Sequence, residues 1–469
     1  MRTAPARFNF APSRRILRRR AGVRACHGAM HRDMTDNITR RGFLGVLSSG
    51  SLLPAMAAGQ TFSSANVPAG SRDLWEWVRA QLVLDPGLAW LDTARCGPVL
   101  RAAMAQGFRS RERQSGDFAG YEAAASSPAS VRQRLAAVAS FLGAEPDDLA
   151  YTSGAAEGLG TVARGLDLQP GDEVLTTTHD RPAAVYPWLL EAKRRGFRVV
   201  QLPQDGVPVS PEAIVARFEA AITPRTRVLA FAHVQTTDGT VMPVRELCAL
   251  ARGKNIFTLV DGAMGPGLLD GRLADMGCDA YAASCHRWLN APLGTGLLYL
   301  GREARTRVWP LTARSPAGWD TSDRYGIPSA PAGADGMPEA QAEYGCLSQF
   351  QVPNQQGIGL AIDFQQAVNK ARIGARIREL ASYLRQRLAT LPGVQVVTPA
   401  HPSLSAGIVS LRVPGREHGA MVQSMAEEDR VAVGYVAQGP VLDAIRISMH
   451  PANDIDDVER CVNALRRRL

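Results

Sequence analysis

Lysine is almost absent from this chain. Of the 53 basic residues among 469, only Lys193, Lys254 and Lys370 are lysines. On a protein surface arginine supplies the same charge, so the scarcity is harmless there. Arginine cannot supply a nucleophilic amine, because its guanidinium group stays protonated in proteins. No lysine lies between Lys254 and Lys370, so chemistry that needs a lysine amine in that interval is excluded.

Paired cysteines are also missing. The seven cysteines are scattered, with no Cys-x-x-Cys motif and no even framework of spacings. Zinc sites and disulfide-stapled scaffolds depend on such patterns. We therefore expect neither a metal site nor a disulfide framework.

Excess charge is missing from most of the chain. Residues 1–57 contain eleven arginines and two aspartates, which account for the whole formal charge of +9. Residues 58–469 contain equal numbers of basic and acidic side chains. A neutral main body argues against nucleic acid as a partner, since binding to phosphate backbones needs a basic surface.

The basic leader has the features of an export signal. Arg40-Arg41-Gly42-Phe43-Leu44 opens an uncharged stretch that ends in Ala55-Met56-Ala57. A charged segment, an apolar segment and a small-x-small motif are typical of a signal peptide, and the paired arginines resemble a twin-arginine (Tat) signal. We expect cleavage after Ala57 and a periplasmic or secreted product. The alternative is a chance arginine pair in an arginine-rich leader.

Two details qualify the leader. The uncharged stretch is short and rich in glycine and serine, so we expect no membrane anchor after cleavage. Met34 offers a more usual start for such a signal, which leaves open whether residues 1–33 are translated.

The rest of the chain has globular composition and alternates strand-like with helix-like segments. Apolar runs separated by helical segments indicate an α/β fold with a mainly parallel sheet covered by helices. Expected strands are 149–152, 173–177, 197–202, 227–233, 256–261, 279–283 and 296–300, with helices near 155–165, 183–195, 211–221 and 243–253. Residues 303–345 predict a long loop, 357–391 a long helix, and the remainder a smaller α/β unit with strands near 394–398, 407–413, 431–434 and 443–448 and a last helix from Ile455.

Several motifs occur in the order found in one enzyme family. The segments are residues 90–98, 279–288, 294–300 and 445–448. Together they resemble the class V aminotransferase family, which includes cysteine desulfurases, selenocysteine lyases and isopenicillin N epimerases. The resemblance covers nearly all of the mature chain and implies the PLP-transferase fold type I. It divides the chain into a leader (1–57), a large cofactor-type domain (58–345) and a long helix with a small C-terminal domain (346–469).

The resemblance places Arg287 where family members carry the lysine that forms a Schiff base with pyridoxal phosphate (PLP). It implies PLP as cofactor, but covalent attachment is doubtful because a guanidinium cannot form the imine. His286, next in the chain, is the candidate for proton transfer, although a lone histidine is more often a packed, hydrogen-bonded residue. Arg287 and His286 are therefore the predicted catalytic positions.

Other positions follow from the same resemblance. The turn that opens the helix at Ala155 could hold a phosphate through backbone N–H groups, and Asp261 could keep the pyridine nitrogen protonated. Alternatives are an ordinary strand–helix turn and a capping aspartate. The predicted cofactor-binding residues are Ala155, Ala156, Arg181 (stacking on the ring), Gln235 or Thr236, Asp261, Met264, Ser284, His286 and Cys346.

Arg446 is the predicted substrate-binding residue, because this family's arginine pairs with the substrate carboxylate. The alternative is a structural ion pair. Substituted positions converge on one pocket: Arg181, Met264, Arg287 and Cys346 all differ from the family pattern.

Three hypotheses remain open. The first is an exported, non-catalytic or repurposed member that binds an anionic or amino-acid-like small molecule. The second is a working PLP enzyme (epimerase, lyase or aminotransferase) that uses a rearranged site, with His286 moving the proton. The third is a structural subunit paired with an active paralogue. The family resemblance otherwise implies a homodimer, and the leader implies the Tat export machinery as a partner.

Overall fold

The computed structural model describes residues 62–311 except 205, residues 339–345, and residues 351–469 except 439–441. The predicted export signal, the predicted site residue Cys346 and most of the predicted loop 303–345 lie outside the described residues. Residues Gly59–Leu469 form one compact unit.

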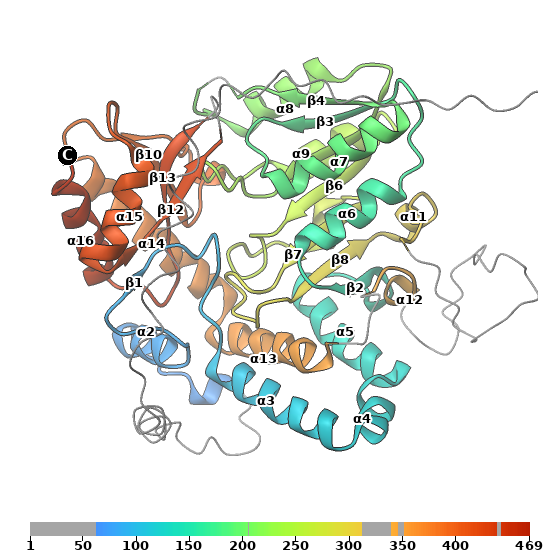
Figure 1. The fold of residues 1–469 in the computed structure, drawn as a ribbon, viewed down its shortest axis with the longest axis horizontal. Helices are drawn as coiled ribbons and strands as arrows, with labels where there is room; N and C mark the ends of the chain where they lie inside the picture. The colour runs from blue at the N-terminus through green and yellow to red at the C-terminus, as the bar shows by residue number, and fades with distance from the viewer. Residues whose placement is uncertain (1–61, 205, 312–338, 346–350, 439–441) are drawn as a thin grey trace, which may run out of the picture. The chain divides into compact units, whose positions relative to one another are not determined.

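A seven-stranded sheet forms the centre of the larger part (Figure 1). All neighbouring strands are parallel except the two pairs that involve β8. Each strand begins and ends within one residue of its predicted position. In sheet order the strands are β2 (Leu149–Thr152), β8 (Gly296–Leu300), β7 (Ala280–Ser284), β6 (Phe257–Gly262), β5 (Thr226–Ala232), β3 (Glu173–Thr177) and β4 (Arg198–Leu202).

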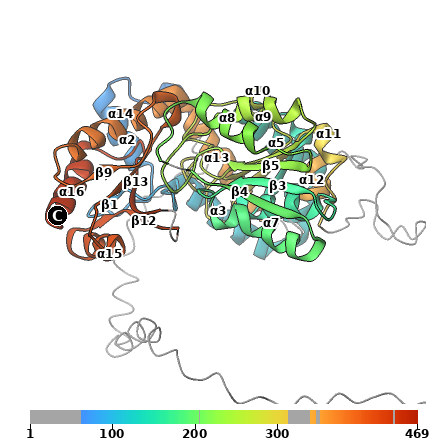
Figure 2. The same cartoon turned by 90° about the horizontal axis from the view of Figure 1, so that it is seen from above.

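Helices cover both faces of this sheet, because its central strands are apolar on both sides. Alternate strand residues enter two different hydrophobic clusters, as the two-residue period of a strand requires. One cluster includes α6 (Ala155–Gly165) and α7 (Pro182–Arg195). The other includes α5 (Pro128–Leu142), α8 (Pro211–Ala221), α9 (Val244–Arg252) and α13 (Val352–Val368). Figure 2 shows β3, β4 and β5 between α7 on one side and α8 and α9 on the other.

The smaller part has an antiparallel sheet in the order β12 (Gly434–Ala437), β13 (Asp443–Ser448), β10 (Ile408–Arg412) and β9 (Gln395–Val396). A separate two-stranded parallel pair joins β1 (Ala89–Trp90) to β11 (Val431–Ala432). The helices of the smaller part are α14 (Lys370–Leu388), α15 (His418–Asp429) and α16 (Ile455–Arg466). The remaining helices are α2 (Ser71–Ala80), α3 (Arg101–Gly116), α4 (Phe118–Ala125), α10 (Leu273–Met276), α11 (Arg302–Arg305), α12 (Glu339–Tyr344) and the short 3-10 turns Ser64–Asn66, Pro146–Asp148 and Pro402–Leu404.

The single long helix expected at 357–391 is wrong, because α13 and α14 are separate helices. Asn369 lies between them with φ of +83°, a left-handed conformation that ends α13. Its side chain then accepts hydrogen bonds from the backbone N–H groups of Ala371 and Arg372 and so caps α14. Asparagine tolerates this conformation better than most residues. The apolar periodicity runs across the break between α13 and α14, so the sequence pattern did not indicate that break.

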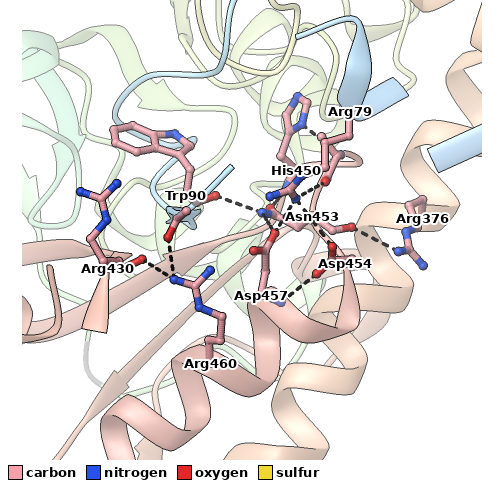
Figure 3. A network of polar contacts seen from close by, with 11 residues as sticks. Arg79, Trp90, Arg376, Arg430, His450, Asn453, Asp454, Asp457 and Arg460 are labelled. Carbon is pink, nitrogen blue, oxygen red and sulfur yellow. Dashed lines mark hydrogen bonds and ion pairs between the residues drawn. The ribbon is translucent and has the colours of Figure 1, made fainter. Parts of the chain in front are cut away.

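A polar network fixes the segment that leads from β1 into the site (Figure 3). Asn453 donates from Nδ2 to the carbonyl oxygen of Trp90 (3.1 Å) and to Asp457 Oδ2 (3.0 Å). Arg79 of α2 pairs with the same carboxylate (2.8 Å). The network holds Trp90, and therefore Asp92 two residues later, against the start of α16.

The fold class expected from the sequence is confirmed: a large, mostly parallel sheet flanked by helices accompanies a smaller sheet. Among the described residues, no helix is both long enough and apolar enough to cross a bilayer.

Candidate functional site

Most predicted site residues follow strands of the large sheet at one edge. The carboxyl ends of parallel strands form the edge at which ligands bind in such sheets. Arg181 comes shortly after β3, Asp261 lies near the end of β6, and residues 285–287 follow β7. Thr236 follows β5, and its carbonyl oxygen accepts a hydrogen bond from Arg446 of β13 (3.1 Å). Both sheets therefore contribute to one site.

Arg181 and Asp261 form a bidentate ion pair. Arg181 donates from Nε to Asp261 Oδ2 (2.5 Å) and from Nη2 to Oδ1 (3.0 Å). The backbone N–H of Ala263 also donates to Oδ1 (3.0 Å). Burial opposes the charge of Arg181, but its attraction and hydrogen bonds to Asp261 prevail and raise its pKa above the usual value. Both oxygens of Asp261 thus already have partners from the chain.

Asp180, which the sequence analysis did not select, braces the turn that carries Arg181. Its carboxylate accepts hydrogen bonds from the hydroxyls of Thr176 and Thr177 and from the backbone N–H groups of Thr177 and Ala232, each at 2.9 Å. Burial raises the pKa of Asp180 to about 6, against the effect of these hydrogen bonds. An aspartate in the turn that follows a buried strand is a signal that could have identified it.

Arg287 lies in the same site without a carboxylate of its own. Its Nη1 donates to the carbonyl oxygen of Ala94, and no ion pair joins it to a carboxylate among the described residues. Burial, together with the nearby charges of Arg181 and Arg446, lowers its pKa to about 10, while Asp261 acts in the opposite direction. The guanidinium groups of Arg181 and Arg446 therefore both lie within electrostatic reach of Arg287.

The backbone at Arg287 is held by a close contact that needs glycine. The N–H of Gly97 donates to the carbonyl oxygen of His286 (2.9 Å). A Cβ atom at Gly97 would lie 1.8 Å from the carbonyl oxygen of Arg287, well inside van der Waals contact. Gly97 therefore allows the segment after β1 to pack directly on residues 286 and 287.

Arg446 pairs with Asp92, a second residue that the sequence analysis missed as a site residue. The distance from Arg446 Nη2 to Asp92 Oδ1 is 2.7 Å, and the two side chains are 12% and 6% exposed. Gly434 lies beside the pair, where a Cβ atom would approach both side chains to within 3 Å. The structural ion pair that was the alternative role for Arg446 is therefore present. Nη2 of its guanidinium already has a carboxylate partner.

The N-terminus of α6 is partly satisfied by side chains. The N–H of Ala155 donates to the hydroxyl of Ser284 (3.1 Å). Glu157 turns back and accepts hydrogen bonds from the N–H (2.6 Å) and hydroxyl (2.7 Å) of Ser153. Ala156 is exposed in the same turn. A carboxylate near these donors leaves less positive potential for a bound phosphate.

His286 lies beside Arg287, and its Nδ1 is 3.3 Å from the carbonyl oxygen of Thr295. Its pKa lies below the usual value because the ring is partly buried and because Arg287 is close.

Met264 is 1% exposed and belongs to the main hydrophobic cluster. Gln235 is fully buried and donates to the Thr177 hydroxyl (3.2 Å).

The site thus contains three guanidinium groups and two carboxylates that pair with them, while the third carboxylate, Asp180, is hydrogen-bonded to its own turn and to β5. Each of the first two carboxylates is paired with one arginine: Asp261 with Arg181, and Asp92 with Arg446. Arg287 supplies the uncompensated positive charge. A buried charge without a partner is unfavourable, so this arrangement favours an anionic ligand.

A large cavity of about 920 Å³ lies elsewhere, between α3, α4, α5 and α13. None of the predicted site residues lines it. Charge and strand topology therefore mark the site better than cavity size does.

The sequence and fold were compared with known proteins. The model of the family Aminotransferase class-V matches residues 98–461. An isopenicillin N epimerase from Amycolatopsis lactamdurans is 31% identical over 414 residues, which cover 84% of this chain and 98% of that protein. A probable cysteine desulfurase from Pseudomonas aeruginosa is 32% identical over 345 residues, covering 69% and 79%.

A solved structure has a similar fold: a mutant of C-DES with glycine covalently linked to its PLP cofactor. It superposes with a TM-score of 0.70 at 22% identity and covers 83% of this chain and 98% of that one. The expected resemblance to PLP-dependent proteins of fold type I is confirmed.

Proposed function

Because the chain belongs to the class V aminotransferase family, we propose that it is an exported member whose site binds a small anionic molecule without forming a Schiff base. The observation that carries this proposal is the guanidinium of Arg287 in a site whose carboxylates Asp261 and Asp92 are already paired. Export rests on the leader, and a homodimer is part of the same proposal.

The position of Arg287 supports its assignment to the family's lysine position. It lies three residues after β7, at the carboxyl edge of the sheet, beside Asp261. Its guanidinium stays protonated near neutral pH even with a pKa of about 10, and it does not attack a carbonyl carbon. The covalent step of the family is therefore removed at this residue.

No other lysine compensates. Lys193 lies in the last turn of α7, at the far end from Arg181, roughly 15 Å or more along the helix. Lys254 precedes β6 and so lies at the opposite edge of the sheet from Asp261. Lys370 starts α14 and pairs with Asp270 (3.0 Å). All three lie in the described part of the chain, so covalent PLP does not fit this site.

The chain's own residues can bind an anion instead. Arginine offers two parallel N–H groups that match a carboxylate or phosphate. Arg287 has no competing ion pair among the described residues, whereas Arg446 shares its charge with Asp92. We propose that the ligand's acidic group lies against Arg287 and that Arg446 orients it.

A second candidate is an active enzyme that uses PLP or its amine form without a covalent link. The neutral state of His286 favours it, since its lowered pKa leaves a ring nitrogen able to accept a proton at neutral pH. In that case His286 would be the proton-transferring group, and PLP would have to bind tightly without a covalent bond to residue 287.

Two measurements test the proposal on the chain lacking residues 1–57. Absorbance after incubation with PLP, followed by borohydride reduction and intact mass, reports covalent binding, and we expect no adduct. Thermal shift with acetate, inorganic phosphate and amino acids reports anion binding. At 100 times the Kd a ligand stabilises the protein by about 2.7 kcal/mol.

The matched variants are Arg287→Met, which should abolish the shift, and Arg72→Met, which should retain it because Arg72 is 90% exposed on α2. A phosphopyridoxyl adduct on the native protein would refute the proposal. The absence of any anion-induced shift would refute it as well.

A further inference from the structure

We propose that Arg181 takes the place of the cofactor's ring nitrogen at Asp261, and that it closes the site to PLP independently of Arg287. The inference rests on the proposed function, because it treats the site as one that has lost PLP. It adds a second determinant, however, and predicts that restoring the lysine alone does not restore the cofactor.

The ion pair uses the same carboxylate that a pyridine nitrogen would need. A PLP ring is an electron sink only while its nitrogen is protonated by a nearby carboxylate. Asp261 is 3% exposed, and both its oxygens accept from Arg181, at 2.5 and 3.0 Å. The N–H of Ala263 shares one of them. A ring nitrogen could reach Asp261 only by displacing the guanidinium.

Displacement is unfavourable because one carboxylate cannot neutralise two cations. Arg181 is only 16% exposed, so loss of Asp261 would leave a largely buried guanidinium unpaired. A protonated ring nitrogen would also be repelled by that guanidinium. We expect the competition to weaken PLP binding by roughly a hundredfold, the scale set by breaking a buried pair.

The turn that carries Arg181 is fixed from both sheets, so Arg181 cannot retreat with its backbone. Asp180 binds the ends of β3 and β5 through four hydrogen bonds. Gln438, directly after β12 of the smaller sheet, donates from Nε2 to the carbonyl oxygens of Thr178 (2.7 Å) and Asp180 (2.9 Å). Only the side chain of Arg181 is left to move.

Arg181 also lies among the other residues that would surround a cofactor. Its charge lowers the pKa of both His286 and Arg287, which places it within electrostatic reach of each. The family resemblance puts an aromatic residue or histidine at this position, where it stacks on the ring. In this chain the position instead carries a permanent cation that points at Asp261.

The test compares PLP binding in four proteins: the native chain, Arg287→Lys, Arg181→His, and the double variant. A fifth, Arg287→Lys with Arg227→His, controls for losing an arginine, because Arg227 is 46% exposed and pairs with Asp172 on the surface. Each protein is titrated with PLP, reduced with borohydride and examined by peptide mapping for a phosphopyridoxyl group at position 287. Thermal unfolding confirms that each is folded.

We expect an adduct in the double variant at PLP concentrations about a hundredfold lower than in Arg287→Lys, with the control matching Arg287→Lys. If the double variant does not fold, Arg287→Lys with Arg181→Gln replaces it, since glutamine removes the charge and retains a hydrogen-bond donor. Saturable adduct formation in Arg287→Lys alone, at PLP concentrations similar to the double variant, would overturn the role of Arg181 and leave the proposed function intact. An adduct in the native chain would overturn both.

Discussion

The Arg181–Asp261 pair should be energetically coupled, and a double-mutant cycle measures this directly. The variants are Arg181→Met, Asp261→Asn and the two combined. The pair is nearly excluded from solvent, with side chains 16% and 3% exposed, so solvent screening reduces its strength little. Each single variant leaves one buried polar partner without its counterpart.

The expected magnitude follows from burial. Removing one partner of a buried ion pair costs about 3–5 kcal/mol, whereas replacing both by neutral groups costs much less. Unfolding entropy is about 2.1 cal/mol/K per residue, which over the unit Gly59–Leu469 gives about 0.9 kcal/mol/K. Each single variant should therefore lower Tm by about 3–6 °C.

The assay is thermal and urea unfolding of the chain without its leader, at neutral pH and two salt concentrations. The double variant should lose about 2–3 kcal/mol less than the sum of the single losses. Because the pair is buried, added salt should change this coupling little. Additive losses, or single variants that cost less than about 1 kcal/mol, would show that the pair is only a surface contact.

Three further predictions concern neighbouring residues. Asp180 has a folded-state pKa raised to about 6 from 3.8, so the folded state binds the extra proton and the free energy of unfolding should fall as pH rises from about 4 to 6. Asp180→Asn should flatten this slope when Tm is measured against pH, and an unchanged slope would contradict the assignment. Gly97→Ala should lower the free energy of unfolding by at least about 1–3 kcal/mol through overpacking. Gly107→Ala should not destabilise α3, because Gly107 has open space around it. Equal effects of the two variants in urea unfolding would refute the close contact at Gly97. Asp92→Asn should free Arg446 and tighten acetate or phosphate binding by about tenfold, and weaker binding by calorimetry would argue that Asp92 supports the ligand site.

The large sheet could be predicted from the sequence because most of its strands are buried on both faces. Segments such as β2, β3 and β8 are short apolar runs with clear ends, and turn residues or helix starts bound them. The order of the motifs along the chain also predicted Arg287, Asp261 and the residues after β7 as neighbours, since the carboxyl ends of parallel strands share one edge.

The pairings within the site could not be predicted in the same way. Arg181 and Asp261 are 80 residues apart, and Asp92 and Arg446 are 354 apart. Composition and periodicity place each residue on an element but do not say which guanidinium meets which carboxylate. Asp180 and Asp92 were overlooked because they act on other residues and resemble ordinary turn or strand residues.

The two buried ion pairs also bear on how the protein matures. Asp261 and Asp92 each receive a counter-ion from the chain itself, so folding leaves neither of these acidic groups waiting for a prosthetic group. Such a chain can complete its folding without a loading step. That independence would suit a cargo carried across a membrane in its finished form.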